Sequence, residues 1–406
     1  MNGSPVGLQS PLTGSTAQLS RDLPSSLTLA SRFVAIGVHR EAKRWYQDNW
    51  DPDRTVGAWF ELLANSRWGY PGWPTKWFGQ GMDRADVRAV REERRNLGAL
   101  PPPSGIGPSV LAPMLFQHGT EDQMRRFLPA MAWKGETFCQ MLSEPEAGSD
   151  LAGVTTTAIR DGDEWVINGS KIWTSGAHNA DWMFILVRTD IEAPKHEGIS
   201  FMLLPMDQPG IEVRPIRLIS GNSPFNQVFF TNALAARDDL VGALNRGWTV
   251  GKRLLQHERS GMDQLLRGGT SSSGSSLAAI AKDYLGEIDG KIADTSMRSR
   301  VLDHDMTLRS LNLTKRRVIE ESADGNTPGP ATSIFKVMTT DLEKIHYDLA
   351  TSLRGSQGFG WDGESFSEAE LEDLRLLMSS RAASIYSGSN EIQRNIIAKR
   401  VLGLPD

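Results

Sequence analysis

Ser143-Glu144-Pro145-Glu146-Ala147-Gly148-Ser149-Asp150 and, further along, Lys171-Ile172-Trp173-Thr174-Ser175-Gly176 are the two stretches that decide how this chain is organised. Taken alone, the first is typical of a turn built from small polar residues. The second places an indole among small polar side chains. A loop of small residues with free backbone N–H groups, next to an indole, suits a flat ligand with polar edges and apolar faces. Trp173 alone also fits a half-buried structural tryptophan.

Both stretches lie in a region with the hydrophobic pattern of β-strands. Between 137 and 241, short runs alternate or are rich in β-branched residues. These runs are 155–159, 165–167, 183–187, 199–204 and 227–231. Asp161-Gly162 and Asn168-Gly169 are hairpin signals between such runs. On either side of this region the apolar spacing is helical, and the helical stretches are 83–97, 254–266, 306–321, 334–353 and 392–402.

The order of classes along the chain is therefore α, β, α, which predicts an α+β protein of several domains. We expect a flexible N-terminal arm at 1–26, a helical domain at 27–136, a central β domain at 137–244 and a helical domain at 245–406. The Gly/Ser stretch 268–276 lies inside the last of these and favours an intradomain loop. Asn390 with Gln393 has the spacing of a capping box, which predicts a helix start near the C-terminus.

Composition excludes several classes of function. The chain has 406 residues, a net charge of −5 and no basic block, so little favours nucleic-acid binding. No apolar run approaches the roughly 18 residues needed to span a bilayer. The single cysteine, Cys139, forbids an internal disulfide framework and fits a reducing compartment, so we expect a soluble cytoplasmic protein. The seven histidines show no metal-ligand spacing, and no metal site is expected.

The two opening stretches belong to a longer series of ordered motifs, and with them the chain resembles the acyl-CoA dehydrogenase family from about residue 27 to its end. The further motifs are Gly72-Trp73-Pro74, Asp161-Gly162-Asp163, Gly242 through Gly247-Trp248, His257-Glu258-Arg259, Gly358-Phe359-Gly360 and Glu391-Ile392-Gln393-Arg394-Asn395-Ile396-Ile397. The resemblance implies an N-terminal helical domain, a central β-barrel-like domain that binds flavin and a C-terminal four-helix bundle.

The same resemblance implies an FAD-dependent oxidoreductase of fatty acid or lipid catabolism. Such an enzyme converts an acyl-CoA thioester to the 2-enoyl-CoA and passes the electrons to an electron-transferring flavoprotein. It implies an oligomer, either of one chain or with a related subunit. The positions that match the family's flavin contacts are Gln140, Leu142, Ser143, Gly148, Ser149, Trp173, Ser175, Gly355, Ser389 and Glu391. Those that match its substrate contacts are Ser149, Arg259, Ser387 and Gly388.

The expected catalytic base departs from the commonest family pattern. Many members carry a glutamate just after the tyrosine of the tail motif, but here Ser387 follows Tyr386, and serine is no base at ordinary pH. Glu258, next to Arg259, matches the long-chain and isovaleryl arrangement. Leu254, Glu258, Met262 and Leu265 follow helical spacing, which places the carboxylate on an apolar stripe. The alternative is a structural ion pair of Glu258 with an arginine.

A second departure concerns the tail of the cofactor. The family's Arg and Phe that reach a neighbouring subunit's FAD are replaced by Ala281-Lys282-Asp283-Tyr284-Leu285-Gly286-Glu287, and Ser352 stands where glutamine is common. The altered segment suggests one alternative, a low-activity or non-catalytic subunit of a heteromeric dehydrogenase. Because fold alone does not choose, a flavin monooxygenase or oxidase on the same scaffold and a binding protein without chemistry also stay open.

Overall fold

The computed structural model describes residues 29–260, 276–322 and 332–405, with the backbone alone for 29–36, 256–260 and 319–322. The expected arm at 1–26 and most of the Gly/Ser stretch lie outside the described residues. The chain divides into two compact units: residues 1–104 with 125–135, and residues 105–124 with 136–406. No helix in the described ranges is both long and apolar enough to cross a bilayer.

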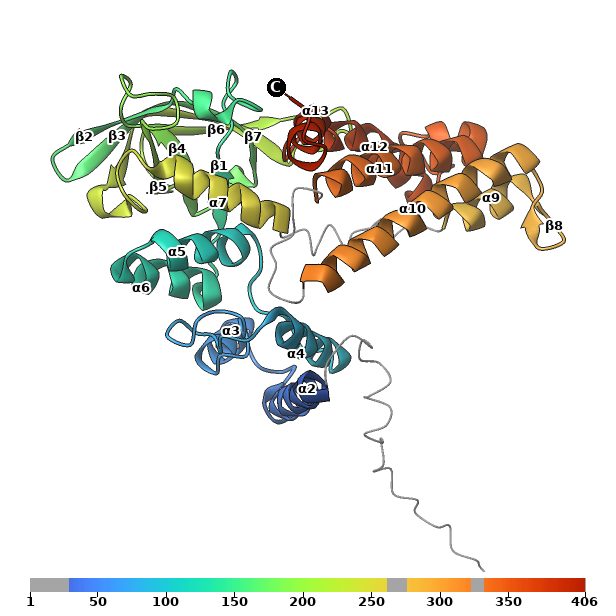
Figure 1. Ribbon diagram of the computed structural model, residues 1–406, viewed down its shortest axis with the longest axis horizontal. Helices are drawn as coiled ribbons and strands as arrows, with labels where there is room; N and C mark the ends of the chain where they lie inside the picture. The colour runs from blue at the N-terminus through green and yellow to red at the C-terminus, as the bar shows by residue number, and fades with distance from the viewer. Residues whose placement is uncertain (1–28, 261–275, 323–331, 406) are drawn as a thin grey trace, which may run out of the picture. The chain divides into compact units, whose positions relative to one another are not determined.

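The first unit is helical, as expected, and is built on an aromatic core. Its helices are α2 (Leu29–Asn49), α3 (Val56–Asn65) and α4 (Arg84–Asn96), drawn in blue in Figure 1. Trp45 stacks on Trp68 with 5.9 Å between ring centroids, and the Trp59 indole donates to the Leu100 carbonyl oxygen at 2.9 Å. Large rings bury much apolar area at little entropic cost, so a few tryptophans suffice to hold three helices together.

The second unit contains one seven-stranded sheet (Figure 1). Its strands are β1 (Phe138–Met141), β2 (Thr157–Asp161), β3 (Glu164–Ser175), β4 (Trp182–Arg188), β5 (Ile199–Pro205), β6 (Ile211–Ile216) and β7 (Phe225–Ala236). They follow the order β1-β4-β2-β3-β7-β6, with β5 paired to β4. All five expected β runs overlap strands, which confirms the central β region; β1 and β6 were not predicted individually.

One of the two hairpin predictions is confirmed and the other is wrong. Asp161 pairs with Glu164 across a turn in which Gly162 has φ +60°. Asn168-Gly169 instead lies inside β3, where the register against β7 shifts. Gly169 has φ +139°, and a Cβ there would lie 2.7 Å from Thr156 Oγ1. Glycine is required here because the strand bulges and its backbone lies close to Thr156. Turn preferences alone do not distinguish a glycine in a bulge from a glycine in a hairpin turn.

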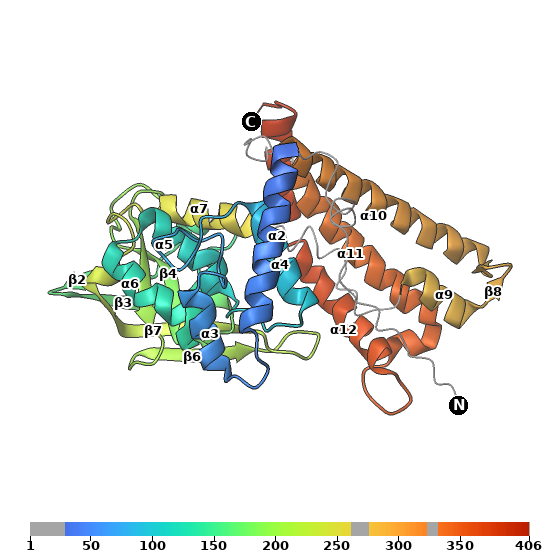
Figure 2. The same ribbon diagram turned by 90° about the horizontal axis from the view of Figure 1, so that it is seen from below.

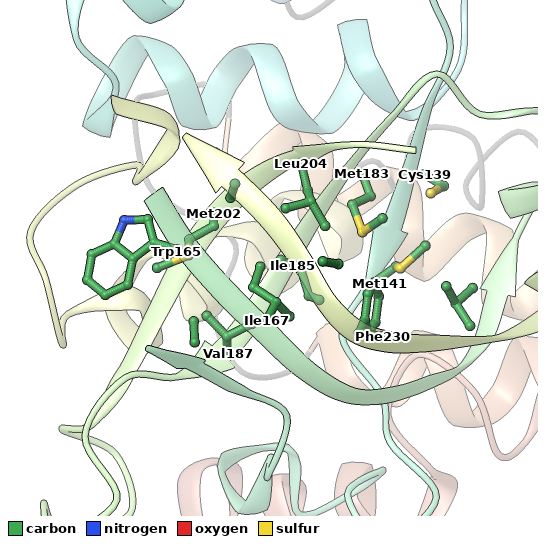
Figure 3. Packing of buried hydrophobic residues seen from close by; sticks show 14 of the residues in the cluster. Cys139, Met141, Trp165, Ile167, Met183, Ile185, Val187, Met202, Leu204 and Phe230 are labelled. Carbon is green, nitrogen blue, oxygen red and sulfur yellow. The ribbon is translucent and has the colours of Figure 1, made fainter. Parts of the chain in front are cut away.

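The core of the β region lies on the inner face of the sheet (Figure 3). β4 and β5 are buried along nearly their whole length because both of their faces are covered. Trp165 and Ile167 on β3 face the same core as Met183 and Ile185 on β4. Cys139 also belongs to this core, and burial raises the pKa of its thiol to about 12, so it stays protonated.

Helix α7 (Gly247–Ser260) packs on β5 and β4 (Figure 1). A Cβ at Gly247 would lie 2.3 Å from the backbone carbon of Ser200, so only glycine lets the helix begin this close to β5. Val250 and Leu254 are buried on one stripe of α7. The predicted helix at 254–266 thus begins earlier than expected, and its part beyond 260 lies outside the described residues.

The remaining helices are α5 (Ala112–His118), α6 (Glu121–Pro129), α9 (Leu277–Leu285), α10 (Thr295–Ser322), α11 (Thr332–Arg354), α12 (Glu368–Ala383) and α13 (Asn390–Ile396). Helices α9, α10 and α12 all pack on α11 (Figure 2). The core between α9 and α11 is apolar, with Leu277, Ile280, Leu349 and Leu353 buried. This is the helical C-terminal domain that the sequence predicts.

Candidate active site

The loop that follows β1 turns back tightly and lies against β3. Glu144 and Ala147 exchange backbone hydrogen bonds of 3.0 and 3.1 Å, which places Pro145 and Glu146 at the exposed tip. Gly148 and Ser149 are also exposed. The Ile172 N–H donates to the Ser143 carbonyl oxygen at 2.9 Å. The two stretches expected to act together are therefore adjacent in space.

Trp173 stands out of the sheet beside this loop. Its φ is +62°, which is rare for a bulky residue, and its side chain is 55% exposed. The register between β3 and β7 shifts between Lys171 and Thr174, so a bulge turns Trp173 outward. Its ring and that of Phe225 are nearly perpendicular, with 6.2 Å between centroids. Strain held at an exposed aromatic residue is typical of a functional site.

The surface formed by these residues fits a flavin. Ser175 is exposed like Trp173, whereas Thr174 between them is buried. A Cβ added at Gly148 meets nothing within 4 Å, so the loop leaves open space beside it. Among the described residues, the buried Thr174 Oγ1 finds no hydrogen-bond partner. An exposed indole, a hydroxyl and a loop of small residues on one surface provide apolar cover and polar edge contacts for a flat ring.

A buried ion pair lies directly beneath this surface. Lys171 Nζ is 2.7 Å from Glu144 Oε1 and 3.2 Å from the Leu142 carbonyl oxygen. Burial lowers the pKa of Lys171 to about 8, although the Glu144 carboxylate opposes this shift. Burial raises the pKa of Glu144, but the Lys171 ammonium and hydrogen bonds from Thr155 and Thr156 more than offset this effect. The pKa of Glu144 therefore lies below its ordinary value.

The tail motif forms a second group of predicted site residues, carried by α11 and α13. Ser387 has φ +52° and Gly388 φ +88°, a strained turn for a serine. Lys336 on α11 donates to the Ala383 carbonyl oxygen at 2.6 Å and to that of Tyr386 at 2.9 Å, and its ammonium lies 4.8 Å from the centre of the Tyr386 ring. The strained turn is thus held from α11.

The helix after this turn begins one residue earlier than the capping-box prediction implied. Ser389 is the N-cap and its Oγ accepts from the Ile392 N–H at 3.4 Å. Asn390 is instead buried, with its side chain 3.1 Å from Thr340 Oγ1. The packing of Asn390 against α11 decides the boundary, because an amide that bonds a neighbouring helix is unable to cap its own. Glu391 in the first turn is exposed.

The other predicted residues are placed as follows. Gly355 directly follows α11 and has φ +57°. Gln140 lies on β1, and Leu142 follows that strand as a buried residue. Glu258 and Arg259 belong to the last turn of α7, but their side chains lie outside the described residues. The structure therefore gathers one group on the β region and a second on the C-terminal helices.

Sequence reasoning missed three charged residues of this site: Glu144, Lys171 and Lys336. The signal available for the first pair was a lysine and a glutamate of opposite charge in two stretches already expected to meet.

In the described ranges, no group of three or more histidine, cysteine, aspartate or glutamate side chains is arranged to hold a metal ion.

Comparison with known families agrees with this geometry across the chain. The acyl-CoA dehydrogenase N-terminal domain matches residues 26–135, the middle domain 139–233 and the C-terminal domain 245–402. Acyl-CoA dehydrogenase IpdE1 of Mycobacterium tuberculosis is 38% identical over 356 residues, which is 86% of this chain and 88% of that protein.

Two solved structures are similar over almost the whole chain. One, titled Tcur3481-Tcur3483 steroid ACAD, is 27% identical with a TM-score of 0.69 and covers 94% of this chain and 100% of its own. The other, the ChsE4-ChsE5 complex from Mycobacterium tuberculosis, is 25% identical with a TM-score of 0.69 and covers 95% and 100%. With three domain matches in order and close relatives over most of its length, the chain belongs to the acyl-CoA dehydrogenase family of FAD-dependent oxidoreductases.

Proposed function

We propose that this protein is a catalytically active acyl-CoA dehydrogenase that oxidises the Cα–Cβ bond of a CoA thioester to the 2-enoyl-CoA. The observation that carries the proposal is the contact between the Ser143 loop and β3, which places the loop beside the strand that carries the exposed Trp173 and Ser175 in a chain of this family. The electrons would pass to an electron-transferring flavoprotein, as the family resemblance implies.

FAD is the cofactor this surface fits, and it would be held mainly by the β region. Ser143, Gly148 and Ser149 would border the ring and its side chain, with Gln140 and Leu142 behind them. Trp173 would lie beside the ring and the Ser175 hydroxyl would bond its polar edge. The chemistry that FAD supplies when bound is acceptance of a hydride from the β-carbon. Gly355, Ser389 and Glu391 are proposed contacts for the more distant part of the cofactor.

Glu258 is the proposed base that removes the α-proton. Leu254, four residues earlier, is fully buried, and residue 258 belongs to the same helical stripe by its spacing. A carboxylate on a buried stripe has its pKa raised by desolvation toward the range useful for proton transfer, whereas Arg259 would oppose that shift. The Ser387 backbone N–H would polarise the thioester carbonyl, with Gly388, Ser149 and Arg259 as further substrate contacts.

The proposed substrate class is a CoA thioester of a steroid-derived acid. Support comes from a similar solved structure whose title describes a steroid ACAD and which matches this chain over 94% of its length. This class requires a wide acyl-binding cavity, because a fused-ring acyl group needs more width than a linear chain does. Straight, branched and aromatic acyl groups are the competing classes.

Anaerobic flavin bleaching tests the cofactor, the reaction and the substrate class together. The purified protein should be yellow and release FAD rather than FMN. Mixed without oxygen with a panel of straight, branched, aromatic and steroid-like acyl-CoAs, it should lose its flavin absorbance fastest with the steroid-like members. Protein that stays colourless after incubation with FAD would refute the cofactor assignment, and equal bleaching by linear thioesters would refute the steroid class.

The second candidate is a low-activity subunit of a heteromeric dehydrogenase. It is favoured by the replaced segment at 281–287, where Tyr284 bonds Glu370 within the chain at 2.6 Å instead of being a family FAD contact. Similar solved structures carry titles that name two components, ChsE4-ChsE5 and Tcur3481-Tcur3483.

A flavin oxidase or monooxygenase on this scaffold would instead consume oxygen, which an oxygen electrode measures directly.

A further inference from the structure

The region beneath the proposed flavin surface contains an ion pair that the proposed reaction does not use. Lys171 has no exposed surface and the Glu144 side chain is 3% exposed. Two charges taken out of water need good geometry and further hydrogen bonds to offset their desolvation. Such a pair contributes little to stability compared with apolar side chains of the same size, so its presence calls for another explanation.

The pair connects three separate backbone segments. The Lys171 ammonium on β3 donates to the Leu142 carbonyl oxygen and to Glu144, both in the loop after β1. The Glu144 carboxylate in turn accepts from the Thr155 N–H at 2.6 Å, the Thr155 hydroxyl at 2.8 Å and the Thr156 N–H at 3.0 Å, just before β2. Every bond runs between segments at least 11 residues apart in sequence.

We propose that Lys171 and Glu144 are positioning residues that hold the Ser143–Ser149 loop against β3 at the distance the flavin ring requires. The inference rests on the proposed function, which makes this surface the flavin site. Neither side chain reaches the surface, so both act through the backbone. Ser143 adjoins Glu144 in sequence, and Trp173 and Ser175 follow Lys171 on the same strand. A shift of about an ångström between loop and strand would misplace both edges of the ring site.

The geometry also explains why an apolar pair would not serve. Methionine side chains at both positions would fill the space, but dispersion contacts are non-directional and would leave the backbone bond between Ile172 and Ser143 without this support. Five directional bonds to charged groups fix the loop in one register. Stability and positioning are thus separable properties of this pair, which makes the inference testable.

The test compares the parent with K171M, K171M/E144M and T155V. The single K171M change leaves a buried carboxylate without its cation and should lower the thermal midpoint. The double variant removes both charges and should regain the midpoint, yet bind FAD at least tenfold more weakly in a fluorescence titration. In the FAD-free chain, hydrogen exchange at the Thr155, Thr156 and Ile172 amides should be at least tenfold faster in the double variant. T155V removes one hydroxyl hydrogen bond made by an exposed residue, and it should lower the affinity for FAD two- to fivefold.

E93Q is the matched control, because Glu93 forms a partly buried pair with His39 at 2.9 Å in the other unit. It should lower the thermal midpoint without changing FAD affinity. A double variant that folds and binds FAD as tightly as the parent would overturn the inference. So would unchanged exchange and affinity in T155V if the double variant does not fold. If the parent itself binds no FAD, the proposed function fails, while amide exchange in the FAD-free chain still tests the positioning role.

Discussion

At residue 258 the proposed chemistry depends on one carboxylate. General-base catalysis typically contributes about 10² to 10⁴ in rate, so E258Q should slow flavin reduction by at least about a hundredfold while its FAD absorbance and thermal midpoint stay near those of the parent. Single-turnover reduction without oxygen, with a thioester that the parent accepts, measures this directly.

The matched comparison is S387A, which changes the residue at the position where many family members carry their base. Only its backbone N–H is proposed to contact the substrate, so its loss should be far smaller than that of E258Q. If E258Q reduces its flavin as fast as the parent, the base lies elsewhere and the mechanism is wrong.

Lys171 makes stability depend on pH in a predictable direction. Its pKa is about 8 in the folded chain and about 10.5 when unfolded. Between these values the unfolded state binds more protons, so this residue makes the free energy of unfolding rise as the pH rises from 8 toward 10.5, and that gain is lost as the pH falls through 8.

Because other groups also titrate in this window, the measurement is the difference between parent and K171M in urea unfolding at several pH values. The difference should shift in favour of the parent as the pH rises from 8 to 10. A constant difference over that range would show that Lys171 is not desolvated as the structure indicates.

At the scale of elements, helix α11 should control the tail turn through Lys336. Hydrogen bonds to a charged group contribute about 1.5–3 kcal/mol, and Lys336 donates two of them across to the end of α12 and the turn after it. We expect K336M to lower the free energy of unfolding by about 1.5 kcal/mol and to speed hydrogen exchange at residues 384–391.

K282M is the control, since Lys282 pairs with Glu287 at the surface at 2.8 Å, and an exposed pair contributes about 0–1 kcal/mol. Its exchange at 384–391 should match the parent. If hydrogen exchange at residues 384–391 is as slow in K336M as in the parent, the contacts of Asn390 with α11 hold the turn without the lysine.

At the scale of the whole molecule, we expect a dimer or a larger assembly, of one chain or with a related subunit. Leu302, Met306 and Leu313 on α10 are 53%, 61% and 59% exposed and follow helical spacing, so the described residues leave this apolar stripe of α10 uncovered. Light scattering on the purified protein should show at least a dimer, and M306D should reduce the assembly.

A surface substitution away from the stripe, such as R300E, is the control for charge alone. A parent protein that is monomeric, holds FAD and turns over would contradict the assembly prediction. Full assembly in M306D would show that the α10 stripe is not the interface.

Local patterns predicted much of this protein because they depend on neighbours in sequence. The α, β, α order follows from hydrophobic period, and the turn at Asp161-Gly162 follows from the residues that a tight turn requires. The same reasoning failed at Asn168-Gly169. This dipeptide is also a common hairpin signal, but here its glycine lies in a bulge that faces Thr156. Local preference and distant packing compete at such a glycine, and the packing decides.

The sequence by itself determined the class of each region, the family, and the candidate loop and strand for the flavin. Only the tertiary structure decided that Ile172 bonds Ser143, that Lys171 lies buried on Glu144, and that Lys336 reaches the Tyr386 turn. The physical reason is that periodicity specifies which face of an element is buried, but not which distant residue meets it there. A buried lysine in particular has no local signature, because its partner is chosen by the fold.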